Sequence, residues 1–286
     1  MAALKNRYDF LLAVEVINSN PNGDPDMGNM PRQDAETGHG IITDVCLKKK
    51  IRDYMTRSMS DKAGYNIYIQ SDDFLNSKDS AAYEAVGGGS KKEDPEIGSK
   101  LHSFMCDNYF DIRAFGAVLT GFAKMNLNAQ VKGPVQVSFG RSVDPIVPQE
   151  ITITRCAVAT ENEKKTHDNT MGNKFIVPYG LYIFEGHVSA ELAEKTGFSE
   201  EDMQALIDAL QNMWSEDTSS SRGHVVARKL IVFKHQSKHG NAPYYKLFDK
   251  VSITRKDPAA PARSFKDYEF KIDKDIPAEI EVKVYE

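Results

Sequence analysis

The segment Tyr8-Asp-Phe-Leu-Leu-Ala-Val-Glu-Val-Ile17 is a continuous apolar run into which only Asp9 and Glu15 intrude. A run of this length and composition indicates a largely buried β-strand. The following residues, Asn18-Ser-Asn-Pro-Asn-Gly-Asp-Pro25, end that strand, because Pro and Gly interrupt the hydrogen-bond ladder while Asn and Asp favour turns. We therefore expect a central strand that leads directly into a turn-rich loop.

A helix is predicted from about Thr43 to Ser58. Thr43 is a suitable N-cap, and Asp44 is favourable at the positive end of the helix dipole. One side of this helix carries apolar residues, namely Leu47, Ile51, Tyr54 and Met55. The helix should bury that side against the sheet.

The rest of the chain predicts further strands and a second helix. The expected strands are Val131 to Phe139, Ile151 to Ala159, Phe175 to Val188, Val226 to His235 and Ile280 to Tyr285, with a loop around Asp144-Pro145. Ser199 caps a helix whose apolar residues recur at spacings of three and four, namely Met203, Leu206, Ile207, Leu210, Met213 and Trp214. The order strand, helix, strand, strand, helix, strand predicts an α+β fold with a ferredoxin-like, RRM-like palm.

Two insertions interrupt this order, because the segments between the predicted elements are longer than ordinary connections. We expect the palm to comprise residues 1–59, 131–159 and 175–286, with a finger-like insertion at 60–130 and a thumb hairpin at 160–174. Residues 85–95 indicate a flexible surface loop, and residues 257–274 a surface excursion.

Composition places the chain among ordinary globular proteins, with 41% hydrophobic and 27% charged residues. The sequence contains no apolar stretch of the roughly 20 residues needed to cross a bilayer, and its start lacks a secretion signal, so a cytoplasmic protein is expected. Cys46, Cys106 and Cys156 lie far apart and outside any CxxC pair, which argues against a disulfide framework or a structural zinc site. No cofactor and no metal are predicted.

The formal net charge of −5 is unfavourable for nucleic-acid binding, but the charges are unevenly distributed along the chain. Residues 46–62 carry six basic and two acidic side chains, residues 222–250 seven and one, and residues 185–217 one and nine. We interpret this distribution as segregated positive and negative faces. Such a surface would attract an anion on one side and a basic partner, including another copy, on the other.

The basic residues of the first helix, Lys48, Lys49 and Arg52, lie away from its apolar side, where they can follow a phosphate backbone without contacting bases. A merely solvated face is the alternative. Gly38, Gly40 and Thr43 lead into the helix N-terminus, whose free N–H groups can hold an anion, although a plain turn explains these residues equally well.

The sequence gives little support for an enzyme. Asp24, Asp26, Asp34 and Asp44 follow the first strand and would suit a metal-dependent nuclease, but turn chemistry explains most of them. The sequence has no P-loop, HExxH or GxSxG motif, and its histidines show no ligand spacing. The aromatic signature with which RNA-recognition domains stack bases is also missing, so any RNA must be gripped by its backbone.

Several long segments resemble one known family. They are Asn20 to Pro25, Gly40 to Tyr54, Tyr109 to Gly116, Lys132 to Gln136, Val177 to Tyr182 and Val232 to Pro243. Together they closely resemble the guide-RNA-binding backbone subunit of the type I-C CRISPR Cascade complex, a member of the Cas-seven superfamily. The resemblance implies a hand-like, non-catalytic subunit whose copies stack head to tail along the guide RNA, with each thumb reaching over the neighbour and displacing a base.

The implied partners are crRNA, further copies of the chain, the large, tip and crRNA-processing subunits, and target DNA paired to the guide. The predicted RNA-binding residues are Asn20, Gly38, Gly40, Thr43, Lys48, Lys49, Arg52, Arg113, Lys164, Lys165, Met171, Lys174, Lys234 and His235. Met171 is either a wedge between bases or a pin that seats the thumb on its own palm. Two other functions remain open: an RNase that uses Asp24, Asp26 or Asp34, and a structural protein that self-assembles without RNA.

Overall fold

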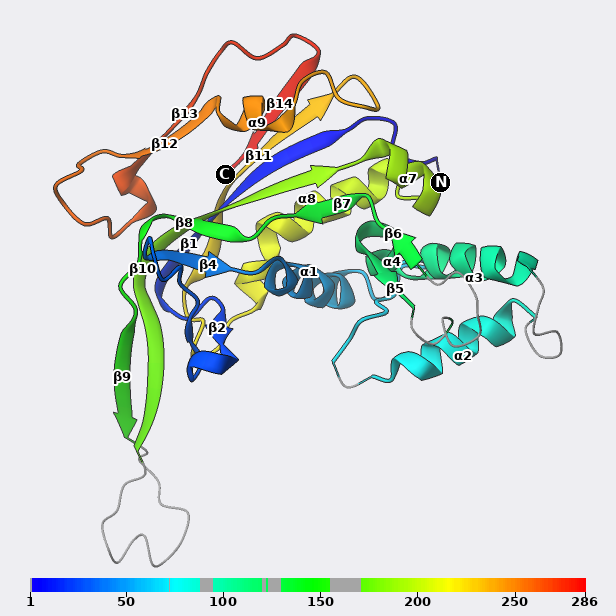
Figure 1. The fold of residues 1–286 in the computed structure, drawn as a ribbon, viewed down its shortest axis with the longest axis horizontal. Coiled ribbons are helices and arrows are strands. Elements are labelled where there is room, and N and C mark those ends of the chain that lie inside the picture. The colour runs from blue at the N-terminus through cyan, green and yellow to red at the C-terminus, as the bar shows by residue number, and fades with distance from the viewer. Residues whose placement is uncertain (1, 72, 88–94, 120–121, 123–129, 155–170) are drawn as a thin grey trace, which may run out of the picture.

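One large antiparallel sheet organises the chain, and the computed structural model describes residues 2–71, 73–87, 95–119, 122, 130–154 and 171–286 (Figure 1). The strand order is β14-β11-β1-β10-β8-β4, and β7 and β9 also pair with β10. These strands are β1 (Tyr8–Ser19), β4 (His39–Ile42), β7 (Val135–Val137), β8 (Gly140–Pro145), β9 (Gln149–Thr154), β10 (Met171–Val188), β11 (Val225–His235) and β14 (Ile280–Tyr285).

Helices and three small two-stranded sheets surround this large sheet. The α-helices are α1 (Asp44–Ser58), α2 (Leu75–Ala85), α3 (Pro95–Asn108), α4 (Phe110–Phe115), α7 (Ala190–Thr196), α8 (Glu200–Glu216) and α9 (Tyr244–Phe248). The small sheets pair β2 (Gly23–Asp24) with β3 (Met30–Pro31), β5 (Gly116–Val118) with β6 (Gln130–Lys132), and β12 (Val251–Arg255) with β13 (Tyr268–Ile272). Single 3-10 turns are η1 (Pro25–Met27) and η2 (Phe265–Asp267). Among the described helices, none combines the length and apolar character that crossing a bilayer requires.

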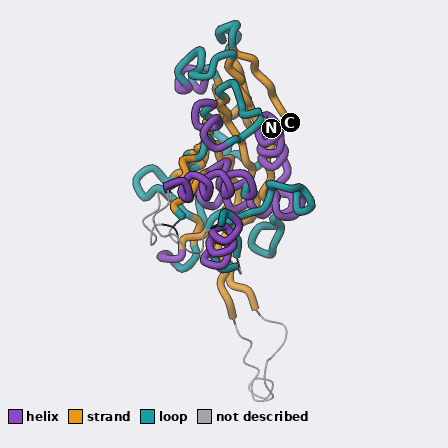
Figure 2. Tube along the Cα trace, turned by 90° about the vertical axis from the view of Figure 1, so that its right-hand side faces the viewer, coloured by secondary structure: helices purple, strands orange, loops and turns teal. Residues whose placement is uncertain are grey.

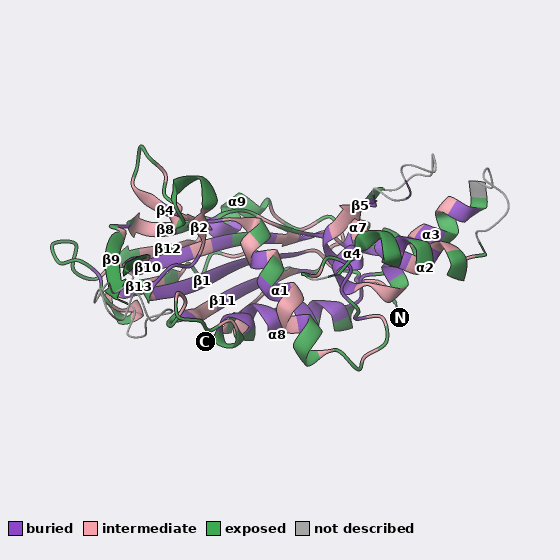
Figure 3. Ribbon diagram, turned by 90° about the horizontal axis from the view of Figure 1, so that it is seen from below, coloured by how far each residue is buried: buried purple, intermediate pink, exposed green. Residues whose placement is uncertain are grey.

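Strand β1 lies between β10 and β11 and is buried on both faces, as its apolar run predicts. Its side chains alternate, so that Phe10 and Leu12 join the core beneath α1 and α8, whereas Leu11 and Ala13 point to the other face of the sheet. Figure 3 shows α1 and α8 side by side against the buried strands. Glu15 on β1 is also buried, with its carboxylate accepting a hydrogen bond from the Phe265 backbone N–H at 2.6 Å.

Both predicted helices are confirmed, together with their caps. The Thr43 hydroxyl accepts a hydrogen bond from the Cys46 N–H at the start of α1. Ser199 and Asp202 form a reciprocal capping box at the start of α8. The apolar side chains predicted for α8 are all buried, and the side chain of Trp214 packs in the same core as Leu47 and Ile51 of α1.

The prediction that residues 257–274 form only a surface excursion is wrong. These residues include η2 and β13, and β12 with β13 forms a hairpin over the sheet face opposite α1. Tyr268 and Ala262 are buried there against Tyr179 and Leu181 of β10. The segment therefore closes the face that a simple RNA-recognition domain leaves open for bases.

The predicted finger-like segment contains a hydrophobic cluster of its own. Its members include Tyr68, Leu101, Met105, Ile112, Phe122 and Val131, contributed by α3, α4 and the flanking chain. In Figure 1 these helices lie at one end of the large sheet. Part of the predicted surface loop, residues 88–94, lies outside the described residues.

Strand boundaries between residues 130 and 175 differ from the prediction. The expected strand Val131 to Phe139 is split into β6 and β7 at Gly133 and Pro134, since Pro134 has no N–H to donate to a strand ladder. Residues expected to form a loop around Asp144 instead end strand β8. Strand β10 begins at Met171, so the boundary expected at residue 174 falls inside a strand, and Figure 2 shows β9 and this part of β10 leaving the sheet as an arm.

Candidate nucleic-acid interface

Two lysines on α1 occupy the face predicted to contact phosphate. Lys48 pairs with Asp44 at 2.8 Å and Lys49 with Asp53 at 2.6 Å, each within one turn of the helix. Such i,i+4 pairs contribute only about 0.3–0.5 kcal/mol each, so their carboxylates can be replaced by a phosphate at little cost. Lys48 and Lys49 thus keep charges that a ligand can recruit.

Arg52 does not belong to this accessible face, although the sequence places it one turn from Lys48. Its Nε donates to the Asp111 carboxylate at 2.8 Å, and Asp111 is completely buried. The same carboxylate accepts hydrogen bonds from the Tyr68 and Ile69 N–H groups. Arg52 therefore joins α1 to the inserted segment, a structural role that the helix spacing alone does not reveal.

The acidic residues of α8 neutralise much of the basic segment 46–62. Lys50 is buried in an ion pair with Asp217 just beyond the helix, Arg57 pairs with Glu216, and Lys62 pairs with Glu201. The interpretation that these charges form segregated faces is wrong at this contact. Charges that lie apart in the sequence are brought together because α1 and α8 pack side by side.

The N-terminus of α1 is held by the loop that follows β1. The Asn22 side-chain oxygen accepts hydrogen bonds from the Thr43 N–H and hydroxyl, at 2.9 and 3.1 Å. Asn20, one of the predicted RNA-binding residues, is buried, and its amide donates to the Asn29 carbonyl at 2.8 Å. Thr43 and Asn20 thus shape the helix entrance.

Gly38 and Gly40 also have conformational reasons to be glycine. Gly38 has φ of +73°, which residues with a Cβ rarely adopt. A Cβ on Gly40 would lie 2.8 Å from Cε1 of Tyr182 and 2.9 Å from Cδ1 of Ile146. Neither glycine needs a ligand to explain it.

Arg113 is placed in the interior, so its predicted contact with RNA is contradicted. Its Nε and Nη2 donate to the Asp202 carboxylate at 3.0 and 2.8 Å, and Nη1 donates to the Gly64 and Cys106 carbonyls. Burial opposes ionisation of Asp202, but the guanidinium holds the pKa of this carboxyl below its ordinary value. Arg113 connects the inserted segment to α8.

His235 is likewise buried and unavailable to RNA, contrary to the prediction. Its Nδ1 accepts a hydrogen bond from the Asn241 N–H, so Nε2 carries the proton and donates to Asp9 at 2.8 Å. Burial opposes ionisation of Asp9, yet hydrogen bonds from His187, His235 and Arg7 lower the pKa of that carboxyl strongly. Lys234 is half-buried, with its ammonium 5.5 Å from the centre of the Tyr8 ring.

The arm presents apolar side chains to solvent. Met171 is 70% exposed, and Ile153 on the paired strand is 51% exposed. This exposure contradicts the alternative in which Met171 is a pin against its own palm. Lys174 donates to the Ser220 carbonyl, which ties the root of the arm to the loop after α8. Lys164 and Lys165 lie outside the described residues.

Among the residues that the structure describes, the loop aspartates proposed for an RNase have other partners, except Asp26. Asp24 accepts a hydrogen bond from the Asp26 N–H at 3.1 Å and pairs with Arg32. Asp34 pairs with Arg141, and the Thr37 and Glu36 N–H groups lower the pKa of the Asp34 carboxyl. Within the described ranges, no group of three His, Cys, Asp or Glu side chains is placed to hold a metal ion.

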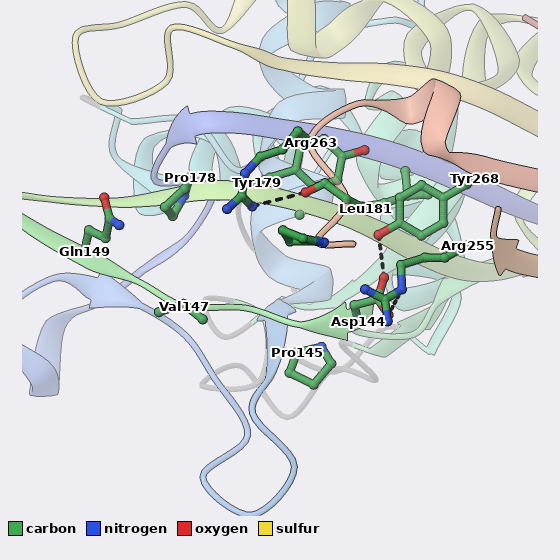
Figure 4. Close-up of a pocket in the computed structure, with 13 residues that line it drawn as sticks. Asp144, Pro145, Val147, Gln149, Pro178, Tyr179, Leu181, Arg255, Arg263 and Tyr268 are labelled. Carbon is green, nitrogen blue, oxygen red and sulfur yellow. Dashed lines mark hydrogen bonds and ion pairs between the residues drawn. The ribbon is translucent and has the colours of Figure 1, made fainter. Parts of the chain in front are cut away.

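A pocket of about 280 Å³ lies at the root of the arm, on the sheet face opposite α1 (Figure 4). Pro178 to Leu181 of β10 form one wall, while Arg255 at the end of β12 and Arg263 in the segment that follows β12 also line the pocket. Tyr268 donates a hydrogen bond to Asp144 at 2.6 Å across one end. Sequence reasoning missed this pocket, because its walls come from segments about a hundred residues apart that share no motif.

Comparison with known proteins now identifies the family. A family model described as CRISPR-associated protein Cas7 matches residues 6–273. The chain belongs to the Cas7 family. A Cas7 relative, the CRISPR-associated protein Cas7 of Haloferax volcanii, is 26% identical over 251 residues, which cover 82% of this chain and 72% of the relative. The predicted membership of the Cas-seven superfamily is thereby confirmed.

The structure is also similar to chains of solved complexes. A chain of a CRISPR RNA-guided surveillance complex in a pre-nicking state matches with a TM-score of 0.50 and 14% identity, covering 79% of this chain and 78% of that chain. A chain of a second CRISPR RNA-guided surveillance complex matches with a TM-score of 0.47 and 12% identity, covering 79% and 68%. The first match shows that the α+β arrangement with its large antiparallel sheet is shared.

Proposed function

We propose that this Cas7 protein is the non-catalytic backbone subunit of a type I-C Cascade complex, and that it binds crRNA through phosphate contacts. The observation that carries the proposal is the membership of residues 6–273 in the Cas7 family. The α1 face supports it, because the ion pairs of Lys48 and Lys49 lie within their own helix, although the Lys48 ammonium also lies 5.9 Å from the centre of the Phe115 ring. Contacts to phosphates alone would let the subunit accept any guide sequence.

The palm in this proposal is the ferredoxin-like unit. Strands β11, β1, β10 and β8 lie side by side in that order and are antiparallel, which is the order expected when two βαβ halves interleave. Helices α1 and α8, the crossovers of the two halves, cover the same face. The arm formed by β9 and the start of β10 serves as the thumb, and Met171 on it is the candidate wedge.

The non-catalytic assignment rests on the partners that two of the loop aspartates already have within the fold. Asp24 and Asp34 are engaged in turn hydrogen bonds and ion pairs that fix their loops, so they serve the fold rather than a metal. In this proposal the chain works in the cytoplasm with further copies of itself, with the large, tip and crRNA-processing subunits, and with target DNA paired to the guide. It needs no cofactor.

The test uses the purified full-length chain and RNAs of guide length but unrelated sequence. We expect equal affinities for these RNAs, a steep loss of binding with salt, and RNA that stays intact in Mg²⁺. Strong preference for one sequence would contradict phosphate recognition. Cleavage that disappears in Asp24→Asn, Asp26→Asn or Asp34→Asn would instead establish the RNase, and absence of RNA binding would leave a self-assembling protein.

A further inference from the structure

The pocket at the root of the arm has aliphatic walls and one available cation. Pro145, Val147 and Pro261 are exposed around it, whereas the Tyr179 and Tyr268 rings are buried and stack on each other with centroids 6.3 Å apart. These rings therefore offer no free face on which a nucleobase could stack, which single-stranded nucleic acids normally require. The exposed lining suits an aliphatic side chain.

Arg263 supplies the charge. Its guanidinium donates to the neighbouring Ala262 carbonyl at 3.2 Å, and no carboxylate within the described residues pairs with it. Arg255, in contrast, is engaged by Asp144 and by the Pro258 and Ala260 carbonyls. The pocket is thus suited to an apolar side chain that stands next to a free carboxylate.

The described part of this chain contains such a pair. Four exposed large apolar side chains directly follow an acidic residue: Met27 after Asp26, Val45 after Asp44, Phe74 after Asp73 and Ile151 after Glu150. In three of them the carboxylate is engaged, since Asp44 pairs with Lys48, Asp73 with Lys78 and Glu150 with Asn173. Of these four acidic residues, only Asp26 has a carboxylate to which the described residues supply no such partner.

Hydrogen bonds within the loop close the turn that carries Asp26 and Met27. Asp24 caps η1 and its carbonyl accepts from the Asn29 N–H at 2.7 Å, while Gly28 and Asn29 both take the left-handed conformation. Met27 is 62% exposed at the tip. Because these hydrogen bonds already fix the turn, less backbone freedom remains to be lost when Met27 binds, which favours its use as an anchor.

The loop and the pocket lie on opposite faces of the sheet. Asn22 fastens the loop to Thr43 at the start of α1, and α1 packs on the face that contains Tyr182. The pocket is lined by Tyr179 and Leu181 from the other face. An anchor and a socket on opposite faces of one chain produce a head-to-tail contact, which extends into a row of copies where the rotation between them does not close a ring.

We propose that the pocket is the socket for a second copy of this chain, with Met27 of one copy entering between the aliphatic walls and Asp26 pairing with Arg263 of the next. This rests on the proposed function, which requires copies in a row, and it names the residues that join them. It also gives Asp26, which the sequence offers as a nuclease residue, a role in assembly.

The test separates copy–copy contact from RNA contact. The affinity of each variant is measured for a short RNA that binds one copy and for a longer RNA that binds several copies. The gain in affinity per copy on the longer RNA gives the cooperativity between copies. Arg263→Asp and Asp26→Arg should each weaken the copy–copy association by about tenfold or more, because each places like charges opposite one another. The chain carrying both substitutions should return to within about threefold of wild type, and binding to the one-copy RNA should not change.

Lys266→Asp is the matched control, since it makes the same charge change on the same segment outside the pocket and should leave cooperativity unaltered. Met27→Ser tests the apolar half of the contact at an exposed position, independently of any folding effect of Arg263→Asp. Failure of the double substitution to restore assembly overturns the proposal. Weaker binding of Arg263→Asp to the one-copy RNA would also overturn the proposal, because the pocket would then be a nucleotide site. Unchanged cooperativity in every variant would overturn it too, and would assign the pocket to another partner. If the wild-type chain does not bind RNA at all, the proposed function is refuted, and this result is distinct from failure of the copy–copy contact.

Discussion

Replacing both Lys48 and Lys49 by Gln should weaken RNA binding without unfolding the protein. Replacing Arg52 by Gln should instead lower the stability of the fold and leave RNA binding unchanged. The three side chains lie within five residues of one helix, and sequence reasoning assigns them the same role. The structure separates them, because the lysines pair with residues of their own helix and Arg52 pairs with the buried Asp111.

The expected magnitudes follow from these contacts. Loss of two i,i+4 pairs costs below about 1 kcal/mol, a small part of a typical stability of about 5–15 kcal/mol. Loss of two phosphate contacts lowers the magnitude of the slope of log binding constant against log salt concentration by about 1.4. A fourfold rise in salt concentration should therefore reduce the ratio of wild-type to variant RNA affinity about sevenfold. Arg52→Gln leaves a buried carboxylate without its cation, which costs up to about 3–5 kcal/mol and lowers the melting temperature by about 10 °C.

Two measurements check this. Thermal unfolding without RNA gives the stability of each variant, and titration of one RNA at several salt concentrations gives the slope. The Arg52→Gln chain is measured well below its melting temperature and should keep the wild-type slope. If Arg52→Gln instead melts like wild type and loses about 0.7 from the slope, its guanidinium contacts phosphate. A wild-type slope in the double lysine variant would mean that this helix face is only solvated.

Three further predictions concern single side chains. Because the folded-state pKa of Asp202 is lowered, its pair with Arg113 stabilises the fold above about pH 4, and this contribution is lost as the pH falls through the folded-state pKa. The melting temperature of Asp202→Asn should therefore lie below that of wild type at pH 7. The difference between the two melting temperatures should narrow toward pH 3. Gly40→Ala places a methyl group against Tyr182 and should cost about 1–3 kcal/mol in denaturant unfolding while leaving the salt slope unchanged; an unaltered midpoint would contradict the packing argument. Met171→Ala should change stability by less than about 0.5 kcal/mol, since the side chain is exposed, and should act only on periodic base displacement along the guide, read by chemical probing.

The elements that the sequence predicts well are those whose signal is local. Strand β1 follows from an apolar run, and α8 follows from one capping residue and a repeating apolar spacing. Each pattern lies within one element and is read directly from consecutive residues. The hairpin of β12 and β13 was missed for the opposite reason, because only packing on Tyr179 turns a polar, Pro-rich segment into a structural layer.

Individual site residues were harder to predict, because exposure depends on distant partners. Arg113 meets Asp202, and His235 meets Asp9 at the far end of the sequence. No spacing rule links residues so far apart. A basic residue within a family motif is therefore weak evidence for contact with RNA until the fold shows whether a carboxylate already holds it.

The paired charges also bear on how a chain of net charge −5 could bind a polyanion. Of the basic residues in 46–62, Lys50, Arg57 and Lys62 pair with the α8 region and Arg52 with Asp111, which leaves Lys48 and Lys49 in exchangeable pairs. For the proposed function, residues 46–62 of each copy then contribute few phosphate contacts. Tight binding to a guide must come from several copies on one strand, where every added contact is intramolecular. Contacts between copies, such as the one proposed at Arg263, would therefore determine affinity as strongly as the lysines do.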